Sequence, residues 1–272
     1  TLVGLIIHWR TRHYRNRELA LARKVQERTA ALETANQQLL LQSQAIEQAS
    51  LTDPLTGLHN RRFLTQHIDN DAALALRRYR SGDGRAIDNA DVVFYLIDVD
   101  HFKTVNDLWG HAAGDAVLIE MRNRLQQVFR ATDYLIRWGG EEFLGVARGT
   151  SRSTSADLAE RIRDAINGTP FVLENGLEID IACSTGFAAY PFFADLPDAL
   201  SWQETLALAD TGLYVAKHGG RNAWCGFEAG QHGATDALVR AAKATPSDID
   251  TLLPLRVSRH LSQIKFRTPD DA

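Results

Sequence analysis

The chain has 272 residues, of which 44% are hydrophobic and 24% charged, enough for one large core or two modest ones. A net charge of −4 argues against a general nucleic-acid binder, because such proteins present a basic surface. Cys183 and Cys225 lie far apart and form no metal-binding spacing, which suits a reducing cytosol better than a disulfide framework.

The amino-terminal residues 1 to 7 form a short apolar run, too brief for a membrane span, which needs about 20 residues. The arginines that follow directly are Arg10, Arg12, Arg15 and Arg17. The end of a membrane helix with a positive cytoplasmic flank has this pattern, and so does a frayed basic helix end. Because the chain begins with Thr1 rather than Met, we expect it to be a fragment of a longer protein.

Residues 17 to 50 contain no Gly or Pro and are predicted to form one long helix. Apolar d positions at a spacing of seven are Val25, Leu32, Leu39 and Ile46. The matching a positions are Ala22, Thr29, Asn36 and Ser43. This half-polar seam predicts a weak parallel coiled coil. The alternative is a single linker helix packed on its own domain, but a polar helix of this length has little else to hold it.

After this helix, Pro54 and Gly57 predict a wide turn, followed by an amphipathic helix over 60 to 80 and a surface loop over 81 to 90. The near-continuous apolar run 92 to 99 is typical of a central strand covered on both faces. It leads into Asp98-Val99-Asp100, and strand alternation puts the two carboxylates on the same side. A carboxylate at the end of a buried strand is costly unless it meets a cation or water, so we predict a metal site.

Two β-prone runs, 134 to 138 and 143 to 147, flank Gly139-Gly140 and predict a β-hairpin. The glycines can adopt positive φ and leave the backbone bare enough for a ligand to approach. Glu141 and Glu142 would then lie at the hairpin tip. The plain alternative is a solvated acidic turn, but the acidic end of the strand at 92 to 99 favours a site.

The rest of the chain predicts further alternating elements. Helices are expected over 117–129, 155–166, 202–216 and 237–244, and strands over 171–173, 178–189 and 223–227. The region 231–272 is interrupted by prolines and carries no chemical motif. The predicted organisation is a signalling coiled coil (1–50), one α/β domain (51–228) and a tail of unknown role (229–272).

Residues 51 to 228 resemble a GGDEF domain, the diguanylate cyclase catalytic module, in its Gly-Gly-Glu-Glu-Phe variant. The matching blocks are Asp53-Pro54-Leu55-Thr56-Gly57-Leu58 with Asn60-Arg61-Arg62, Asp98-Val99-Asp100-His101-Phe102-Lys103 with Asn106-Asp107, Gly110-His111 with Gly114-Asp115, Arg137-Trp138-Gly139-Gly140-Glu141-Glu142-Phe143, Ala209-Asp210 with Leu213-Tyr214-Val215-Ala216-Lys217, and Gly220-Arg221-Asn222. The departure within these blocks is Gly212, where the family usually has Ala. We expect it to cost about 1 kcal/mol of helix propensity without touching the chemistry.

The resemblance implies an α/β (α+β) fold with a central, mostly antiparallel sheet flanked by helices, akin to the palm of polymerases and class III nucleotide cyclases. It also implies the condensation of two GTP into cyclic di-GMP and two pyrophosphates. The family assigns two Mg²⁺ per active site, with Mn²⁺ as a substitute, to Asp98, the Val99 carbonyl and Glu141. Glu141 is the suggested proton acceptor, and Glu142 supplies the second catalytic acid.

The resemblance also assigns substrate contacts, at Phe102, Lys103, Asn106, His111, Asp115, Lys217 and Arg221. The cations among them serve the phosphates, with a surface salt bridge as the plain alternative. Lys217 and Arg221 are four apart at a helix end, so both are expected to point the same way. Asn106 and Asp115 match the positions that read guanine, and the Asp carboxylate would reject adenine.

Arg130-Ala131-Thr132-Asp133 stands where the family carries its Arg-x-x-Asp product-inhibition site. Arg130 offers paired donors to phosphate or guanine, and Asp133 can accept from guanine. Arg161 matches a second arginine that contacts product bound to a neighbouring domain. The alternative is a local Arg–Asp pair closing a turn.

As partners the resemblance implies GTP, cyclic di-GMP, a second copy through the parallel coiled coil, and a sensor domain before Thr1, but no nucleic acid. It also implies a cytoplasmic domain of a protein anchored in a bacterial inner membrane. A catalytically dead nucleotide sensor would have lost hairpin or metal acids that are present here. Asp115 and the Arg-x-x-Asp register argue against a class III cyclase. A purely structural dimerisation protein leaves the acidic hairpin unexplained.

Overall fold

The computed structural model describes residues 2–49, 51–81, 88–173, 176–229, 234–243, 253–258 and 260. The chain divides into two compact units, Thr1–Ser50 and Leu51–Ala272, and each is described by itself.

The first unit is a single helix, α1 (Leu2–Ala49), in agreement with the long helix predicted from the sequence. The d-position side chains Val25, Leu32, Leu39 and Ile46 are all more than 60% exposed in the single chain. A stripe of large apolar side chains left in water favours association with another surface. Because these exposures belong to a single chain, the parallel coiled coil stays a prediction. Among the described residues, none of the helices combines the length and hydropathy that a membrane crossing requires.

The second unit is built on a seven-stranded sheet with the order β1-β3-β4-β2-β7-β8-β9. Its strands are β1 (His59–Asn60), β2 (Asp91–Val99), β3 (Tyr134–Gly139), β4 (Glu142–Thr150), β7 (Cys183–Tyr190), β8 (Trp224–Phe227) and β9 (Leu255–Val257). The β1–β3 and β7–β8 pairs are parallel and the other neighbouring pairs are antiparallel. The sheet is therefore mostly antiparallel, as expected.

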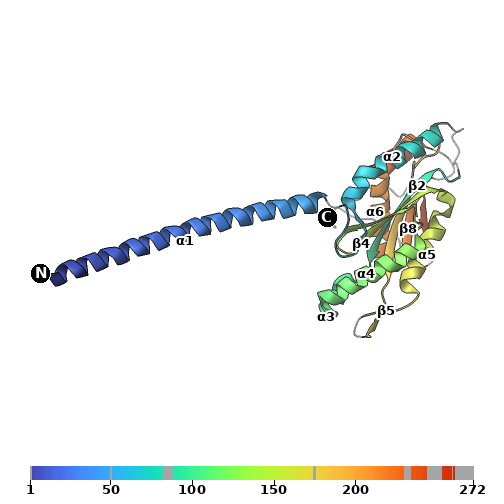
Figure 1. Cartoon of the computed structure of the whole chain (residues 1–272). Coiled ribbons are helices and arrows are strands. Elements are labelled where there is room, and N and C mark those ends of the chain that lie inside the picture. The colour runs from blue at the N-terminus through green and yellow to red at the C-terminus, as the bar shows by residue number, and fades with distance from the viewer. Residues whose placement is uncertain are drawn as a thin grey trace. The chain divides into compact units, whose positions relative to one another are not determined.

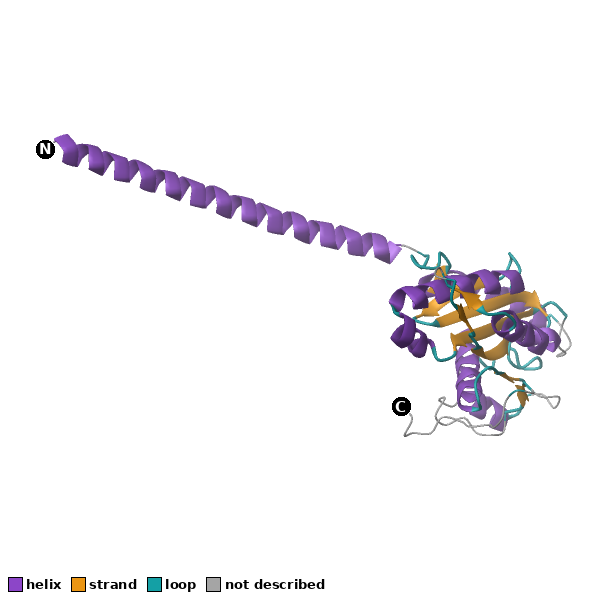
Figure 2. Ribbon diagram, turned by 90° about the horizontal axis from the view of Figure 1, so that it is seen from below, coloured by secondary structure: helices purple, strands orange, loops and turns teal. Residues whose placement is uncertain are grey.

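Helices cover both faces of this sheet (Figures 1 and 2). One face packs against α4 (His111–Val128) and α5 (Ser155–Asn167), and the other against α2 (Arg61–Arg80) and α6 (Trp202–His218). Strand β2 alternates between them: Val93, Tyr95 and Ile97 join the first core cluster, whereas Val92, Phe94 and Leu96 join the second. All nine residues of β2 are buried, which confirms the predicted central strand.

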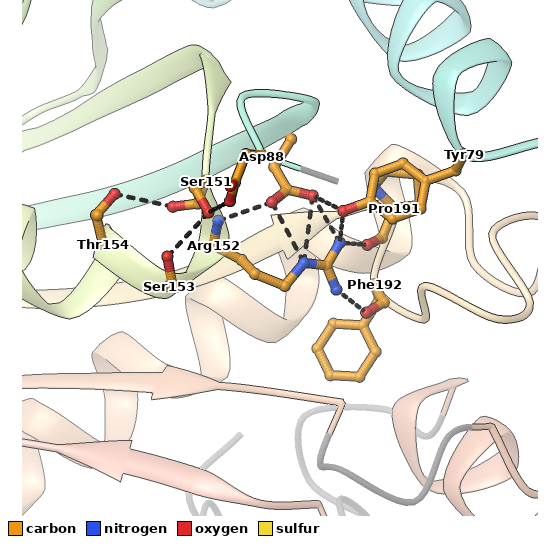
Figure 3. Close-up of polar contacts among 9 residues, drawn as sticks. Tyr79, Asp88, Ser151, Arg152, Ser153, Thr154, Pro191 and Phe192 are labelled. Atoms are coloured by element: carbon orange, nitrogen blue, oxygen red, sulfur yellow. Dashed lines mark hydrogen bonds and ion pairs between the residues drawn. The ribbon is translucent and has the colours of Figure 1, made fainter. Parts of the chain in front are cut away.

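The amino end of β2 is anchored by a buried ion pair between Asp91 and Arg152, from the short helix η1 (Arg152–Thr154). Arg152 Nη2 lies 2.6 Å from Asp91 Oδ1, and the Tyr79 hydroxyl donates to the same oxygen at 2.5 Å. Figure 3 shows the guanidinium held between Tyr79 and the carbonyl groups of Pro191 and Phe192, to which it donates at 2.6 and 2.9 Å. Both carboxylate oxygens of Asp91 and all three guanidinium nitrogens of Arg152 have protein partners, so the cluster fixes structure.

One predicted strand is wrong. The expected strand 178–189 is split: β6 (Glu178–Ile179) pairs with β5 (Phe171–Val172) in a separate two-stranded sheet, and β7 begins only at Cys183. Ile179, Ile181 and Cys183 are all buried, so the alternating pattern runs straight through the break. Periodicity alone therefore could not separate two strands that belong to different sheets.

The tail beyond residue 228 packs on the domain where the structure describes it. Helix α7 (Asp236–Lys243) lies at the predicted position, and its Ala241 and Ala242 join the α6 side of the core with Leu253. Strand β9 pairs antiparallel with β8 and extends the central sheet.

Candidate active site

Two acidic segments meet at the carboxyl end of β2. Antiparallel pairing places Asp98 opposite Glu142 of β4, and the Val99 amide donates to the Glu141 carbonyl at 3.4 Å. Gly140 has φ 50°, as the sharp hairpin tip requires. Asp98 is only 4% exposed, and Glu141 and Glu142 are half-buried. The hairpin and the strand end predicted separately from the sequence therefore lie side by side.

Of the two facing acids Asp98 and Glu142, Asp98 has the more strongly shifted pKa. Burial raises its pKa to about 6, with a further rise from Glu141 and Glu142 and a partial offset from Lys217. Lys217 Nζ lies 2.7 Å from Asp98 Oδ2. Burial likewise raises the pKa of Glu142. When burial and mutual repulsion raise the pKa of a carboxylate, its ionised form is destabilised, and a nearby cation stabilises that form again.

The donor set suits a hard divalent cation. Asp98 and Glu141 could supply carboxylate oxygens and Val99 a backbone carbonyl, the oxygen ligands that Mg²⁺ prefers. Within the described part of the chain, no three His, Cys, Asp or Glu side chains converge as a complete metal cage. Mg²⁺ usually keeps several waters and takes further ligands from substrate phosphates. In the structure the Lys217 ammonium group supplies the positive charge beside Asp98.

Asp100 takes different partners from Asp98, although the sequence grouped the two as metal candidates. It is 6% exposed, and its Oδ1 accepts from Ser184 Oγ at 2.7 Å. Its Oδ2 accepts from the Asn222 amide at 2.8 Å. Burial raises the pKa of Asp100, and these two hydrogen bonds offset part of that rise. Protein donors therefore satisfy Asp100.

The residues matched to guanine recognition come from two packed helices, α3 (Phe102–Trp109) and α4. A Cβ atom added at Gly114 would lie 2.1 Å from Asn106 Oδ1 and 3.1 Å from Phe102 Cζ. Gly114 thus permits the close approach that puts the Asn106 amide against the first turns of α4. Asp115 and His111 are exposed on α4. The Phe102 side chain belongs to the core.

The helical spacing expected to align Lys217 and Arg221 is absent, and their common direction stays a prediction. Helix α6 ends at His218, and Arg221 lies in the following turn with φ 62°. Its amide donates to the Ala216 carbonyl at 3.0 Å. The side chain of Arg221 is exposed, as is that of Lys103 on α3.

Sequence reasoning missed one contact of the hairpin tip. Arg137 Nε and Nη2 donate to the Gly140 carbonyl at 3.1 and 2.8 Å, and its Nη1 lies 3.1 Å from both carboxylate oxygens of Asp53. Asp53 also accepts from the Thr56 amide and hydroxyl at 2.7 Å. Burial works against the charge on Asp53, but Thr56 and Arg137 hold its pKa below the ordinary value. The two partners are 84 residues apart in the chain, so no local spacing could have revealed the pair.

A cavity of about 380 Å³ lies beside the Arg-x-x-Asp segment. Its lining residues are Gly57, Leu58, His59, Gln126, Phe129, Arg130, Ala131, Asp133 and Leu135. Asp133 accepts from the backbone amides of Arg130 and Arg148 at 2.9 and 3.1 Å, so backbone donors orient this carboxylate. Arg161 is outside this lining; its guanidinium donates to the Val128 carbonyl at 3.2 Å.

Comparison with known families gives one match, described as "Diguanylate cyclase, GGDEF domain", over residues 50–223. Among curated proteins, the response regulator PleD of Caulobacter vibrioides is 41% identical over 178 residues, which are 65% of this chain and 36% of PleD. Diguanylate cyclase DosC of Escherichia coli is 34% identical over 216 residues, or 78% of this chain and 43% of DosC. The chain thus spans less than half the length of these relatives.

Among solved structures, the coiled coil and GGDEF domain of DgcB from Caulobacter crescentus, in complex with c-di-GMP, matches with a TM-score of 0.54 and 26% identity. The match covers 73% of this chain and 96% of that one. Diguanylate cyclase SiaD from Pseudomonas aeruginosa, in complex with its activator SiaC, matches with a TM-score of 0.52 and 29% identity, covering 81% of each chain. The family match takes in every block on which the resemblance rested, from the wide turn at Asp53 to Asn222. This chain therefore belongs to the GGDEF domain family of diguanylate cyclases.

Proposed function

We propose that this chain is a diguanylate cyclase domain that condenses two GTP into cyclic di-GMP and two pyrophosphates. The observation that carries the proposal is the buried Asp98 beside the hairpin acids Glu141 and Glu142, with a pKa raised to about 6. Relatives named as diguanylate cyclases support the same reaction.

Asp98, the Val99 carbonyl and Glu141 would hold Mg²⁺ together with the triphosphate. When bound, the metal neutralises phosphate charge and makes the attacking 3′-hydroxyl more acidic. Asp98 must then be ionised, and the Lys217 ammonium that lies 2.7 Å from it becomes available to a phosphate oxygen. Glu141 accepts the hydroxyl proton, with Glu142 as the second acid.

Guanine selection falls to Asn106 and Asp115. An Asp carboxylate accepts from guanine N1–H and N2–H₂ together, whereas adenine offers neither donor there. Losing a paired contact leaves a desolvated carboxylate unpaired, which gives strong discrimination. Lys103 and Arg221 extend from exposed positions and would meet the phosphates.

Each domain holds one GTP, so the 3′-hydroxyl of one must reach the α-phosphate of the other across a pair of domains. The exposed heptad stripe of α1 supports a parallel dimer that raises the local concentration of the second domain. The cavity lined by Arg130 and Asp133 is the proposed site of product inhibition, with Arg161 reaching product on a neighbouring domain.

The direct test is incubation of the purified chain with labelled GTP and Mg²⁺. We expect cyclic di-GMP and two pyrophosphates per product, no turnover of ATP, and weakened GTP-over-ATP preference in Asp115→Ala. Deleting residues 1–50 should make the rate per protein fall steeply on dilution. Tight GTP binding without product would instead indicate a nucleotide sensor.

A further inference from the structure

The turn between α6 and β8 has a costly backbone. Arg221 and Asn222 have φ values of 62° and 45°, and Gly220 before them has φ 128°. A non-glycine residue in the left-handed region costs about 1–2 kcal/mol, so two in succession persist only where the surroundings hold them.

Asp100 holds this turn through a hydrogen bond to its backbone. Its Oδ2 accepts the Asn222 amide at 2.8 Å, and Ser184 Oγ orients the other oxygen at 2.7 Å. From α5, Arg163 Nη1 donates to Asn222 Oδ1 at 3.3 Å. A buried, charge-assisted bond to a backbone amide fixes that amide far better than solvent would.

The C-terminal tail contacts the first residue of β8, shortly after this turn. Trp224, two residues after Asn222, accepts from the Ser258 amide at 3.0 Å, and its own amide donates to Ser258 Oγ at 3.4 Å. Its indole Nε1 donates to Glu160 Oε2 at 2.6 Å, and Glu160 also accepts from Arg163 Nε at 3.0 Å. Ser258 lies beyond residue 223, where the family match ends.

We propose that Asp100 is a positioning residue: it locks the 219–222 turn so that the Arg221 guanidinium is presented to the phosphates of the substrate. The proposal rests on the proposed function where it names the triphosphate as the anion. Asp100 acts through the Asn222 amide and takes no part in metal binding.

The test is a double-mutant cycle. Asp100→Ala and Arg221→Ala should each raise the KM for GTP by about tenfold, the loss of one charge-assisted contact. The double variant should be no worse than Arg221→Ala alone, because both changes remove the same contact. Asp100→Asn keeps an oxygen for the Asn222 amide and should recover most of the affinity. The Mg²⁺ concentration for half-maximal activity should stay unchanged, in contrast to Asp98→Ala.

A second readout needs no turnover. Amide hydrogen exchange in the 219–222 peptide should speed up at least tenfold in Asp100→Ala. The matched control is Asp91→Asn, which alters a buried carboxylate at the other end of β2 and should leave that peptide protected. If Asp100→Ala does not fold, Arg163→Met removes the Asn222 side-chain contact and should speed exchange in the same peptide severalfold.

Three results would overturn the proposal: unchanged exchange at 219–222 in the first variant that folds, a shift of the Mg²⁺ dependence in Asp100→Ala, or additive losses in the double variant. If the parent chain makes no cyclic di-GMP, the proposed function fails. The inference about Asp100 is then decided by the exchange data and by equilibrium titration with GTP across the same variants.

Discussion

The two ends of strand β2 bury carboxylates in opposite ways. At the amino end, Asp91 is fully buried and receives the Tyr79 hydroxyl, the Arg152 amide at 2.7 Å and the Arg152 guanidinium. At the carboxyl end, Asp98 is equally deep in the sheet but faces Glu141 and Glu142, with Lys217 at 2.7 Å.

The difference separates a structural carboxylate from a binding one. Burial alone lowers the pKa of Arg152, but its hydrogen bonds and charge pairing with Asp91 raise that pKa overall, as expected of a closed ion pair. Burial and neighbouring acids instead raise the pKa of Asp98 to about 6. A buried charge whose neighbours repel it is a cost to the fold, which a ligand can relieve.

The largest expected effect is on catalysis. Asp98→Ala or Glu141→Ala should lower cyclic di-GMP synthesis by about a thousandfold or more, because each change removes a proposed metal ligand. Asp91→Asn should leave turnover per folded molecule within about threefold of the parent, since it lies at the structural end. Product formation by chromatography, with circular dichroism to check folding, measures both. Near-normal turnover in the first two variants with Mg²⁺ present would remove the metal assignment.

For stability, we expect a large loss in Asp91→Asn, the variant with the small effect on turnover. Asp91→Asn should lower the free energy of unfolding by about 3 kcal/mol, because it leaves the Arg152 charge buried without its counter-ion. Urea denaturation at neutral pH measures this difference. A change below about 0.5 kcal/mol would show that the Arg152 cluster is not the anchor described above.

The pH dependence of folding stability also distinguishes the two ends of β2. The pKa of Asp98 is about 6 in the folded protein against an ordinary value of 3.8, so the folded state binds this proton more tightly. Without metal, its cost to stability is absent below about pH 4, grows as pH rises through 6, and reaches at most about 3 kcal/mol. Asp98→Asn should therefore gain stability relative to the parent between pH 4 and 7.5, and Mg²⁺ with nucleotide should reduce that gain. A pH-independent difference would contradict the raised pKa.

The smallest effect is expected for Tyr79→Phe, which removes one donor from Asp91 and leaves its ion pair with Arg152 in place. The loss should be about 1–2 kcal/mol of stability, with no change in the KM for GTP. Thermal unfolding beside a substrate titration tests both halves, and any change in KM would mean that the two ends are coupled.

The parts of the site that the sequence predicted are those encoded locally. The hairpin follows from two β-prone runs around Gly139-Gly140, and Asp98 from the apolar run before it. Where the chain partners residues across long separations, local patterns failed: Asp53 with Arg137 is one example, and Asp100 with the Asn222 amide is another.

Gly212 shows that local sequence patterns also failed to predict a packing feature of the fold. Sequence reasoning assigned it only a cost in helix propensity. In the structure, a Cβ atom there would lie 2.5 Å from the Cys225 carbonyl oxygen and 3.3 Å from Gly186 Cα. The glycine therefore lets α6 approach β7 and β8 closely, a packing role that a propensity scale cannot express.

Strand β9 has a practical consequence for anyone who labels this protein. It covers the outer edge of β8 with backbone pairs from Cys225 to Phe227, and Leu253 before it is buried. A fluorescent reporter fused directly after residue 228 would replace that cover and leave a bare row of amide and carbonyl groups, which invites strand addition between molecules. Such a fusion is expected to self-associate through the sheet edge. A reporter should therefore be placed where strand β9 and the buried Leu253 are retained.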